Sequence, residues 1–363
     1  MLIHSDFEQL VSVENLLVCW DRFKKSKRSK SDVMEFERHL EDNIFILHDE
    51  LLSLKYRHGY YSTFNIYDPK HRVISKANVC DRLVHHLVFQ ELYRVFEPTF
   101  IHHSYSSRIG KGTHLAVTNV SRCLRATSRN YTKTVYALKC DIKKFFWSVS
   151  HPKLLAIIKQ RISDERFLAL TQELIESFPR FTDVQSERER ERERERVLFI
   201  ASKTGIPIGN VTSQIFANIY LDQLDQFVKH TLKVKHYFRY ADDFIFIHED
   251  QCYLKLLLVE VEQFLAEKLL LQLHPHKISI RRFNQGIDFL GYIILPHYSV
   301  VRTKTRRRMF KKIKQNLKRL QTGLINQEAF NQSLQSYLGI LKHCEGYKIK
   351  NKIEKFIFSR PIF

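Results

Sequence analysis

The sequence predicts a mixed fold of helices and sheets (α/β, of the α+β type), and three features of its pattern support this. Long segments with apolar residues at helical spacing lie toward both ends of the 363-residue chain, and shorter segments that alternate apolar and polar residues lie in its middle. Hydrophobic residues make up 44% of the composition, which is enough for a packed core in each of two or three subdomains. A largely disordered chain is therefore excluded.

Two helices and a hairpin are predicted in the amino-terminal part. Residues 13–27 and 31–54 carry apolar side chains at helical spacing, and Asp32 is a candidate N-cap of the second helix. Residues 63–75 alternate apolar and polar side chains around an Asp-Pro-Lys turn, which predicts a hairpin with a basic tip. The basic side chains at this tip are candidate phosphate contacts: Lys70, His71 and Arg72.

A glycine-containing loop follows at residues 106–114. It holds Arg108 and Lys111 beside two glycines, so its backbone could approach a nucleic acid closely. The loop lacks the spacing of a Walker loop, and it is weak evidence when taken alone.

Three carboxylates follow or interrupt predicted strands in the middle of the chain. Residues 136–141 form a predicted strand that ends at Asp141, and the segment HYFRYADDFIFIH (236–248) places Asp242 and Asp243 between two apolar half-strands. Aspartate is disfavoured in strands, and adjacent carboxylates raise each other's pKa unless cations neutralise them. The pattern therefore favours a two-metal phosphoryl-transfer site, with an ordinary Asp-Asp turn as the alternative.

Two further segments of the middle region have simpler interpretations. The apolar stretch from Leu254 is interrupted by charged residues, so it predicts a core helix rather than a membrane span. The Glu-Arg repeat within residues 186–197 has no apolar position and predicts a solvated insertion, with a charged recognition tract as the alternative. The first ten residues lack the pattern of a secretion signal, and we expect a cytoplasmic protein without a membrane partner.

The carboxyl-terminal residues 301–363 carry most of the excess positive charge. They hold 16 Lys and Arg against 3 acids, which is +13 of the total of +20. Residues 302–319 combine ten basic residues with apolar positions at helical spacing, and a second amphipathic helix follows. Such a segment is typical of a phosphate-backbone contact, because neutralising phosphates releases counterions; a solvated basic face is the alternative.

Five segments, in this order, resemble the consecutive motifs of reverse transcriptases. They are DIKKFF (141–146), GIPIGNVTSQIFANIYLDQLD (205–225), YADD (240–243), LHPHK ending at Lys277, and GIDFLGYII (286–294). The resemblance implies a right-hand polymerase fold with three parts. Residues 1–130 would form N-terminal helices and fingers, residues 131–296 an antiparallel-sheet palm with the charged insertion, and residues 297–363 a basic helical thumb.

The resemblance implies an RNA-directed DNA polymerase, which is a nucleotidyltransferase. It implies that Asp141, Asp242 and Asp243 are catalytic and that they bind two Mg²⁺ ions together with the main-chain carbonyl of Ile142; Mn²⁺ is a candidate substitute. The implied nucleotide-binding residues are Arg72, Phe146, Ile208, Gly209, Asn210, Gln214 and Lys277. The implied primer grip is Phe289, Leu290, Gly291 and Tyr292. The expected contacts to the nucleic-acid backbone are Arg306, Arg307, Lys311, Lys314 and Lys318. Phe146 would exclude a sugar 2′-hydroxyl, with core packing as the alternative.

One departure narrows the resemblance to the reverse transcriptases of diversity-generating retroelements. Most reverse transcriptases have QGxxxSP in the nucleotide-pocket loop, and this chain has IGNVTSQ at 208–214. Ile208 in place of an amide removes a donor and an acceptor, so the pocket would check base pairs less strictly. That family implies errors at template adenines, cDNA that replaces a variable repeat in a target gene, and a small basic accessory protein.

Two other interpretations remain open at this point. The chain could be a retron, defence-associated or intron-derived reverse transcriptase, or a non-catalytic RNA-binding protein on the same fold. In either polymerase interpretation the partners are template RNA, an RNA–DNA or DNA primer duplex, and dNTPs.

Overall fold

The computed structural model describes residues 3, 6–67, 70–180 and 203–359, and the predicted insertion at 186–197 lies outside them. The chain divides into two compact units. The first comprises Met1–Arg108, Asp141–Val234 and Val259–His274, and the second comprises Ile109–Cys140, Lys235–Leu258 and Pro275–Phe363.

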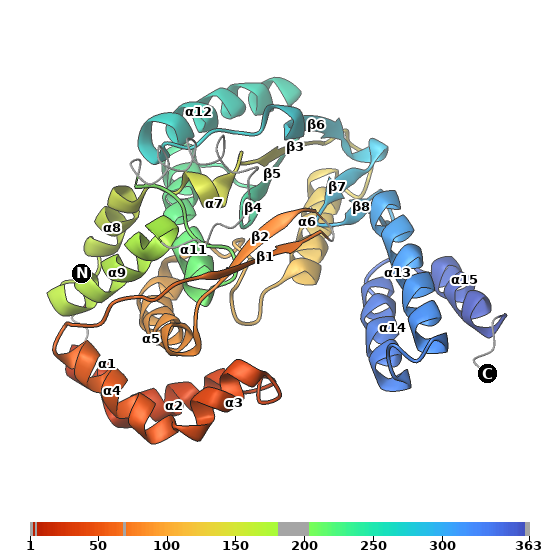
Figure 1. Ribbon diagram of the computed structural model, residues 1–363. Coiled ribbons are helices and arrows are strands. Elements are labelled where there is room, and N and C mark those ends of the chain that lie inside the picture. Colours follow the sequence, from red (N-terminus) through yellow and green to blue (C-terminus); the bar gives the residue numbers. More distant parts are fainter. Residues whose placement is uncertain (1–2, 4–5, 68–69, 181–202, 360–363) are drawn as a thin grey trace, which may run out of the picture. The chain divides into compact units, whose positions relative to one another are not determined.

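The first unit is mainly helical and contains one hairpin (Figure 1). Its elements are α1 (Phe7–Val11), α2 (Val13–Phe23), α3 (Ser31–Arg38), α4 (Leu40–Leu52), β1 (Ser62–Ile66), β2 (Arg72–Lys76), α5 (Val79–Phe96), η1 (Glu97–Thr99), α7 (Phe145–Ser148), α8 (His151–Lys159), α9 (Glu165–Arg180), α11 (Val211–Gln226) and the π-helix η3 (Phe227–Thr231). Helices α5 and α11 pack against each other, and both are buried along much of their length.

The amino-terminal helices confirm the predicted periodicity but differ in two details. Residues 31–54 form two helices, because the backbone leaves helical geometry at His39 between α3 and α4. No Gly or Pro marks this break, so the apolar spacing alone hid it. The predicted N-cap at Asp32 is wrong, because Lys30 precedes the helix. Asp32 instead forms ion pairs with Lys76, at 2.7 Å, and with Arg82.

The predicted hairpin at 63–75 is confirmed. Strands β1 and β2 pair antiparallel, with Ile66 opposite Arg72 and Ser62 opposite Lys76. Asn78 ends the hairpin segment and caps α5, since its side chain accepts a hydrogen bond of 2.8 Å from the backbone N–H of Asp81.

The second unit contains two antiparallel sheets. The larger has the strand order β4-β5-β3-β6, with β3 (Tyr136–Asp141), β4 (Tyr237–Tyr240), β5 (Asp243–His248) and β6 (Ser279–Arg282). The smaller has the order β7-β8-β9, with β7 (Ile287–Phe289), β8 (Tyr292–Ile294) and β9 (Ser299–Val301). Helix α6 (Thr113–Thr127) packs against β4, β5 and β8 and so contacts both sheets. The short helices η4 (Pro275–Lys277) and η5 (Phe283–Gln285) flank β6, and α12 (Gln251–Leu269) runs from this unit into the other.

Three helices end the chain: α13 (Thr303–Gln321), α14 (Gln327–Leu341) and α15 (Tyr347–Phe358), which form a small bundle (Figure 1). The predicted apolar stripe of α13 is confirmed, because Met309, Ile313 and Leu317 are buried. Asn326 caps α14 by accepting a hydrogen bond of 2.8 Å from the N–H of Ala329. No helix in the described ranges is both long enough and apolar enough to cross a bilayer.

A prediction about stability follows from His86 on α5, whose ring lies edge-on to Phe23 at 5.4 Å between centroids. Burial lowers the pKa of His86 to about 4, and Lys27 and Arg82 lower it further. The unfolded chain binds a proton near pH 6.5, whereas the folded chain does not until about pH 4, so the free energy of unfolding falls across this window. In His86→Gln we expect this pH-dependent loss to shrink by about 2 kcal/mol.

Urea unfolding between pH 7 and pH 4 measures this difference. The matched control is His39→Gln, at an exposed position, which should follow the parent curve. Identical slopes for the parent and His86→Gln would contradict the prediction.

Candidate active site

The turn between β4 and β5 presents the two adjacent carboxylates. Tyr240 pairs with Asp243, so Ala241 and Asp242 form a two-residue connection. Ala241 has φ of 52°, in the left-handed region that alanine seldom adopts. Arg239, which is fully buried, donates a hydrogen bond from Nη1 to the carbonyl of Ala241 at 3.3 Å. A buried cation therefore supports the strained turn from below.

Lys139 of β3 is the nearest recorded cation to this turn. Its Nζ lies 3.4 Å from Oδ1 of Asp243, and β3 and β5 are neighbours in the sheet. Sequence reasoning missed Lys139, although it lies two residues before Asp141 on an alternating strand, where both side chains point to the same face. Asp141 is the last residue of β3 and is 9% exposed.

Carboxylate oxygens of this kind fit a hard divalent cation such as Mg²⁺. Among the described residues, no group of three His, Cys, Asp or Glu side chains forms a complete metal site. This agrees with the chemistry of Mg²⁺ in enzymes that act on nucleotides, where one or two carboxylates and the substrate's phosphates hold the ion. The donor set at the ends of β3 and β5 fits such a shared site.

The predicted nucleotide-pocket loop is anchored to the β1–β2 hairpin. The N–H of Ser75 donates to the carbonyl of Ile208 at 2.9 Å, and Nδ2 of Asn210 donates to the carbonyl of Ser75 at 3.3 Å. Gly209 has φ of 131°, and a Cβ there would lie 2.8 Å from a methyl of Ile74 and 3.1 Å from the carbonyl oxygen of Ser75. Only glycine fits this close approach without strain. Gln214, one turn into α11, is exposed.

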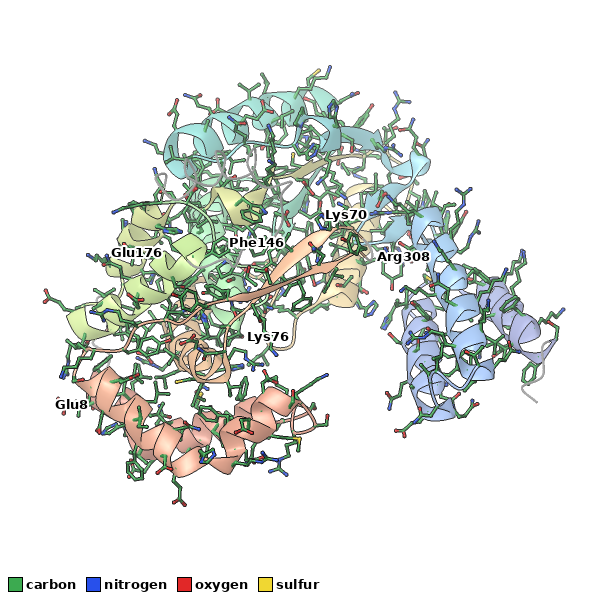
Figure 2. The ribbon with its side chains drawn as sticks, viewed as in Figure 1. Glu8, Lys70, Lys76, Phe146, Glu176 and Arg308 are labelled. Atoms are coloured by element: carbon green, nitrogen blue, oxygen red, sulfur yellow. The ribbon has the colours of Figure 1, made fainter. Side chains whose placement is uncertain are left out.

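Phe146 lies close to the same loop in the chain fold. It is in α7, its ring is half-buried against Phe145 at 5.4 Å, and its carbonyl accepts a hydrogen bond of 2.7 Å from Ile206 (Figure 2). Phe145 is the fully buried ring of the pair, so the sequence's alternative of core packing holds for Phe145 rather than for both.

The basic tip of the β1–β2 hairpin is exposed. Lys70 lies at the tip in Figure 2, and Arg72 begins β2 with its side chain in solvent. His71 instead hydrogen-bonds the Asn65 side chain at 2.8 Å and stacks on Tyr67.

Arg108 does not have the predicted freedom to contact a backbone phosphate. Its guanidinium is 6% exposed and forms two hydrogen bonds of 2.8 Å with the carboxylate of Glu97. It also donates to the carbonyls of Ile101 and Ser104. The prediction that Arg108 approaches a nucleic acid is therefore wrong, because its donors already hold the loop together.

Lys277 lines a basic cavity of about 260 Å³ in the second unit. Lys139 and Arg281 also line it, and Asp288, which pairs with Arg302, is the acid at its edge. The cavity has the charge and the size to admit a phosphate group.

The predicted primer grip is the turn between β7 and β8. Leu290 and Gly291 both have positive φ, at 49° and 91°, as a two-residue turn of the primed type requires. Burial raises the pKa of Tyr292 to about 12, so its phenol stays protonated and donates to the carbonyl of Ile340 at 3.1 Å. His114 of α6 lies 3.2 Å from the same hydroxyl and stacks on His343 at 3.7 Å. The turn is thus fixed to both α6 and the terminal helices.

The five predicted backbone contacts of α13 all have exposed side chains. Among the described residues, none of the five forms an ion pair. They are Arg306, Arg307, Lys311, Lys314 and Lys318. The charge of this helix therefore faces solvent.

Residues 67–294 match the family described as "Reverse transcriptase (RNA-dependent DNA polymerase)". Protein YkfC of Escherichia coli (strain K12) is 27% identical over 289 residues, which cover 69% of this chain and 70% of that protein. The group II intron-encoded protein LtrA of Lactococcus lactis subsp. cremoris is 22% identical over 358 residues, which cover 81% of this chain and 51% of LtrA. The chain thus spans about half the length of that relative.

One solved structure with a similar arrangement is the apo telomerase from Candida Tropicalis truncated from its C-terminal domain. The similarity has a TM-score of 0.48 at 13% identity and covers 68% of this chain and 55% of that one.

Gly209 gives the sharpest test of the loop geometry. We expect Gly209→Ala to lower the free energy of unfolding by about 2 kcal/mol, because a Cβ meets Ile74 and the Ser75 backbone at a positive φ. The matched control is Gly323→Ala, which also has a positive φ, of 70°, but has nothing within 4 Å of the added Cβ. Urea denaturation measures both, and equal losses in the two variants would show that the close approach is absent.

Proposed function

Because the chain belongs to the reverse transcriptase (RNA-dependent DNA polymerase) family, we propose that it extends a primer with dNTPs on an RNA template. The family match covers 228 of the 363 residues and includes the β3 strand, the nucleotide-pocket loop and the YADD turn. Membership confirms the predicted fold class and the predicted enzyme class, an RNA-directed DNA polymerase. The single observation that carries the proposal is the YADD turn at the edge of an antiparallel sheet inside this match.

Reverse transcriptases use divalent metal ions, and we propose two Mg²⁺ ions here, with Mn²⁺ as a substitute. Asp141, Asp242, Asp243 and the carbonyl of Ile142 are the proposed ligands. The ions would supply neutralisation of triphosphate charge. The chain's own contribution is to hold the carboxylates, and Lys139 offsets part of their repulsion while the site is empty of substrate.

The remaining site residues have proposed roles that agree with their surroundings. Arg72 and Lys277 would meet the phosphates of the incoming nucleotide and the leaving group, and Phe146 would exclude a 2′-hydroxyl. Gly209, Asn210 and Gln214 belong to the loop beside the nucleotide, and the turn at Phe289, Leu290, Gly291 and Tyr292 would hold the primer end. The exposed cations of α13 would contact the template–primer backbone, as the division into fingers, palm and thumb proposes.

We propose further that the enzyme is error-prone at template adenines, as in a diversity-generating retroelement that performs mutagenic retrohoming. The support is Ile208, whose side chain offers no hydrogen bond beside the nucleotide, at a position fixed by its carbonyl's bond to Ser75. A small basic accessory protein and a cytoplasmic location belong to this proposal. The group II intron-encoded relative supports the second candidate, an intron-derived enzyme, and the retron and defence-associated types are variants of it.

The polymerase proposal predicts that Asp242→Asn lowers primer extension by about a thousandfold, because charge neutralisation at the reacting phosphates is worth several kcal/mol. Incorporation of dNTPs on a primed RNA with Mg²⁺ is the measurement. The matched control is Asp42→Asn, which removes an exposed carboxylate from α4 and should leave extension unchanged. Binding of the primed RNA without any extension by the parent would favour the non-catalytic RNA-binding protein instead.

The fidelity proposal predicts that Ile208→Gln lowers misincorporation opposite template adenine by about tenfold, because an amide restores a donor and an acceptor at the base pair. Sequencing of cDNA made from a defined template gives the error spectrum. Ile208→Leu keeps the apolar character and should keep the parent spectrum. An unchanged spectrum in Ile208→Gln would remove Ile208 from the explanation, and the absence of paired repeats differing at adenines near the gene would favour the intron-derived type.

A further inference from the structure

A buried chain of hydrogen bonds joins the first turn of α11 to α5 and to the segment before β1. Oγ1 of Thr212 lies 2.7 Å from Nδ1 of His85, and Nε2 of His85 lies 3.1 Å from Nε2 of His58. Nδ1 of His58 then lies 2.7 Å from the carbonyl of Gly59. His58, His85 and Thr212 are 3%, 1% and 1% exposed, so water does not supply alternative partners. We call these three residues the histidine relay.

The directions of these hydrogen bonds are determined when both rings are neutral. A carbonyl only accepts, so His58 carries its proton on Nδ1 and accepts at Nε2. His85 must then donate from Nε2, which leaves its Nδ1 as an acceptor for the hydroxyl of Thr212. Burial holds the pKa of His85 well below its usual value, which keeps that ring neutral.

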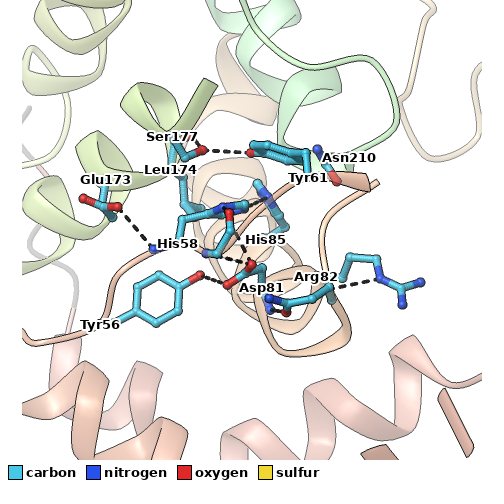
Figure 3. Close-up of polar contacts among 12 residues, drawn as sticks. Tyr56, His58, Tyr61, Asp81, Arg82, His85, Glu173, Leu174, Ser177 and Asn210 are labelled. Carbon is cyan, nitrogen blue, oxygen red and sulfur yellow. Dashed lines mark hydrogen bonds and ion pairs between the residues drawn. The ribbon is translucent and has the colours of Figure 1, made fainter. Parts of the chain in front are cut away.

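The surroundings hold both rings in place. Figure 3 shows His58 and His85 beside Tyr61 and Asp81, with Asn210 of the nucleotide-pocket loop close by. His58 stacks on Tyr61 at 4.5 Å, and the hydroxyl of Tyr61 bonds Ser177 of α9 at 2.8 Å. Asp81, which is buried, accepts hydrogen bonds from the hydroxyl of Tyr56 and the N–H of Gly59. Three elements therefore fix the acceptor that Thr212 meets.

Thr212 is the link between this network and the loop at 208–214. A threonine in a helix usually bonds the carbonyl four residues earlier, which here belongs to Ile208 and already accepts from Ser75. The Thr212 hydroxyl bonds His85 of another helix instead. Ser75 anchors the loop at Ile208 and Asn210, and His85 anchors it at Thr212, so the loop is held on two sides.

We propose that Thr212, His85 and His58 are positioning residues that set where the loop at 208–214 meets the incoming nucleotide, and hence how strictly base pairs are selected. This inference rests on the proposed polymerase function. It assigns the placement of the loop to buried histidines that do not touch the substrate themselves. A loop that shifts by a fraction of an ångström changes nucleotide affinity more than it changes the chemistry of the bound state.

The test compares Thr212→Val, which keeps the shape but leaves Nδ1 of His85 without a donor, with Thr212→Ser, which keeps the hydroxyl. We expect Thr212→Val to raise KM for dNTP by about tenfold and to change the error spectrum, with a much smaller change in kcat. Thr212→Ser should restore KM and the spectrum to the parent values. Thr212→Ala is the second variant if Thr212→Val does not fold, with the same expected result.

The control for a general loss of stability is Ser177→Ala, which removes a hydrogen bond from the same buried cluster without touching the loop. If Thr212→Val matches Ser177→Ala in KM and error spectrum when both are compared at equal melting temperature, the relay only stabilises the fold and the inference is overturned. Failure of the parent to extend a primer would instead contradict the proposed function, so the two failures are distinguishable.

Discussion

The structure of the second unit depends on holding two adjacent carboxylates at a tight turn of an otherwise apolar sheet. Phe244, Ile245 and Phe246 follow Asp243 directly and are fully buried, so the turn has no polar base of its own. Isolated charges in such a setting shift their pKa and lose their ionisation. Arg239 beneath the turn and Lys139 on the adjacent strand supply the opposing charge that keeps a carboxylate pair compatible with this sheet.

The nucleotide-pocket loop of the first unit is held by different physics, since its anchors are neutral. Ser75 and His85 supply directional hydrogen bonds, and Gly209 supplies the close approach that brings the loop against β2. Neutral hydrogen bonds fix position without adding a field that would compete for triphosphate charge. A loop of this kind can change its selectivity through one side chain, such as Ile208, while its backbone stays in place.

Sequence reasoning succeeded where periodicity and local chemistry determine structure, and it failed where partners are distant in the chain. Alternation predicted β3 and the β4–β5 hairpin, and it placed Asp141 at a strand end. The pairing of Arg108 with Glu97 consumed a residue that looked available, because the sequence does not show which acid a cation meets. The bond between Thr212 and His85 joins positions 127 residues apart, so only the packing of α5 on α11 reveals it.

The distribution of ion pairs explains why the excess charge acts through α13. Cations of the first unit have acidic partners: Lys24 has Asp21, Lys76 has Asp32, and Arg94 has Glu91. Residues 302–319 contain no acid, and their five outward cations have no ion-pair partner among the described residues. Charges that are already neutralised release few counterions on meeting a phosphate backbone, whereas exposed unpaired charges release the most. Salt-dependent affinity for a nucleic acid is therefore concentrated in the helix that the sequence alone marked as basic.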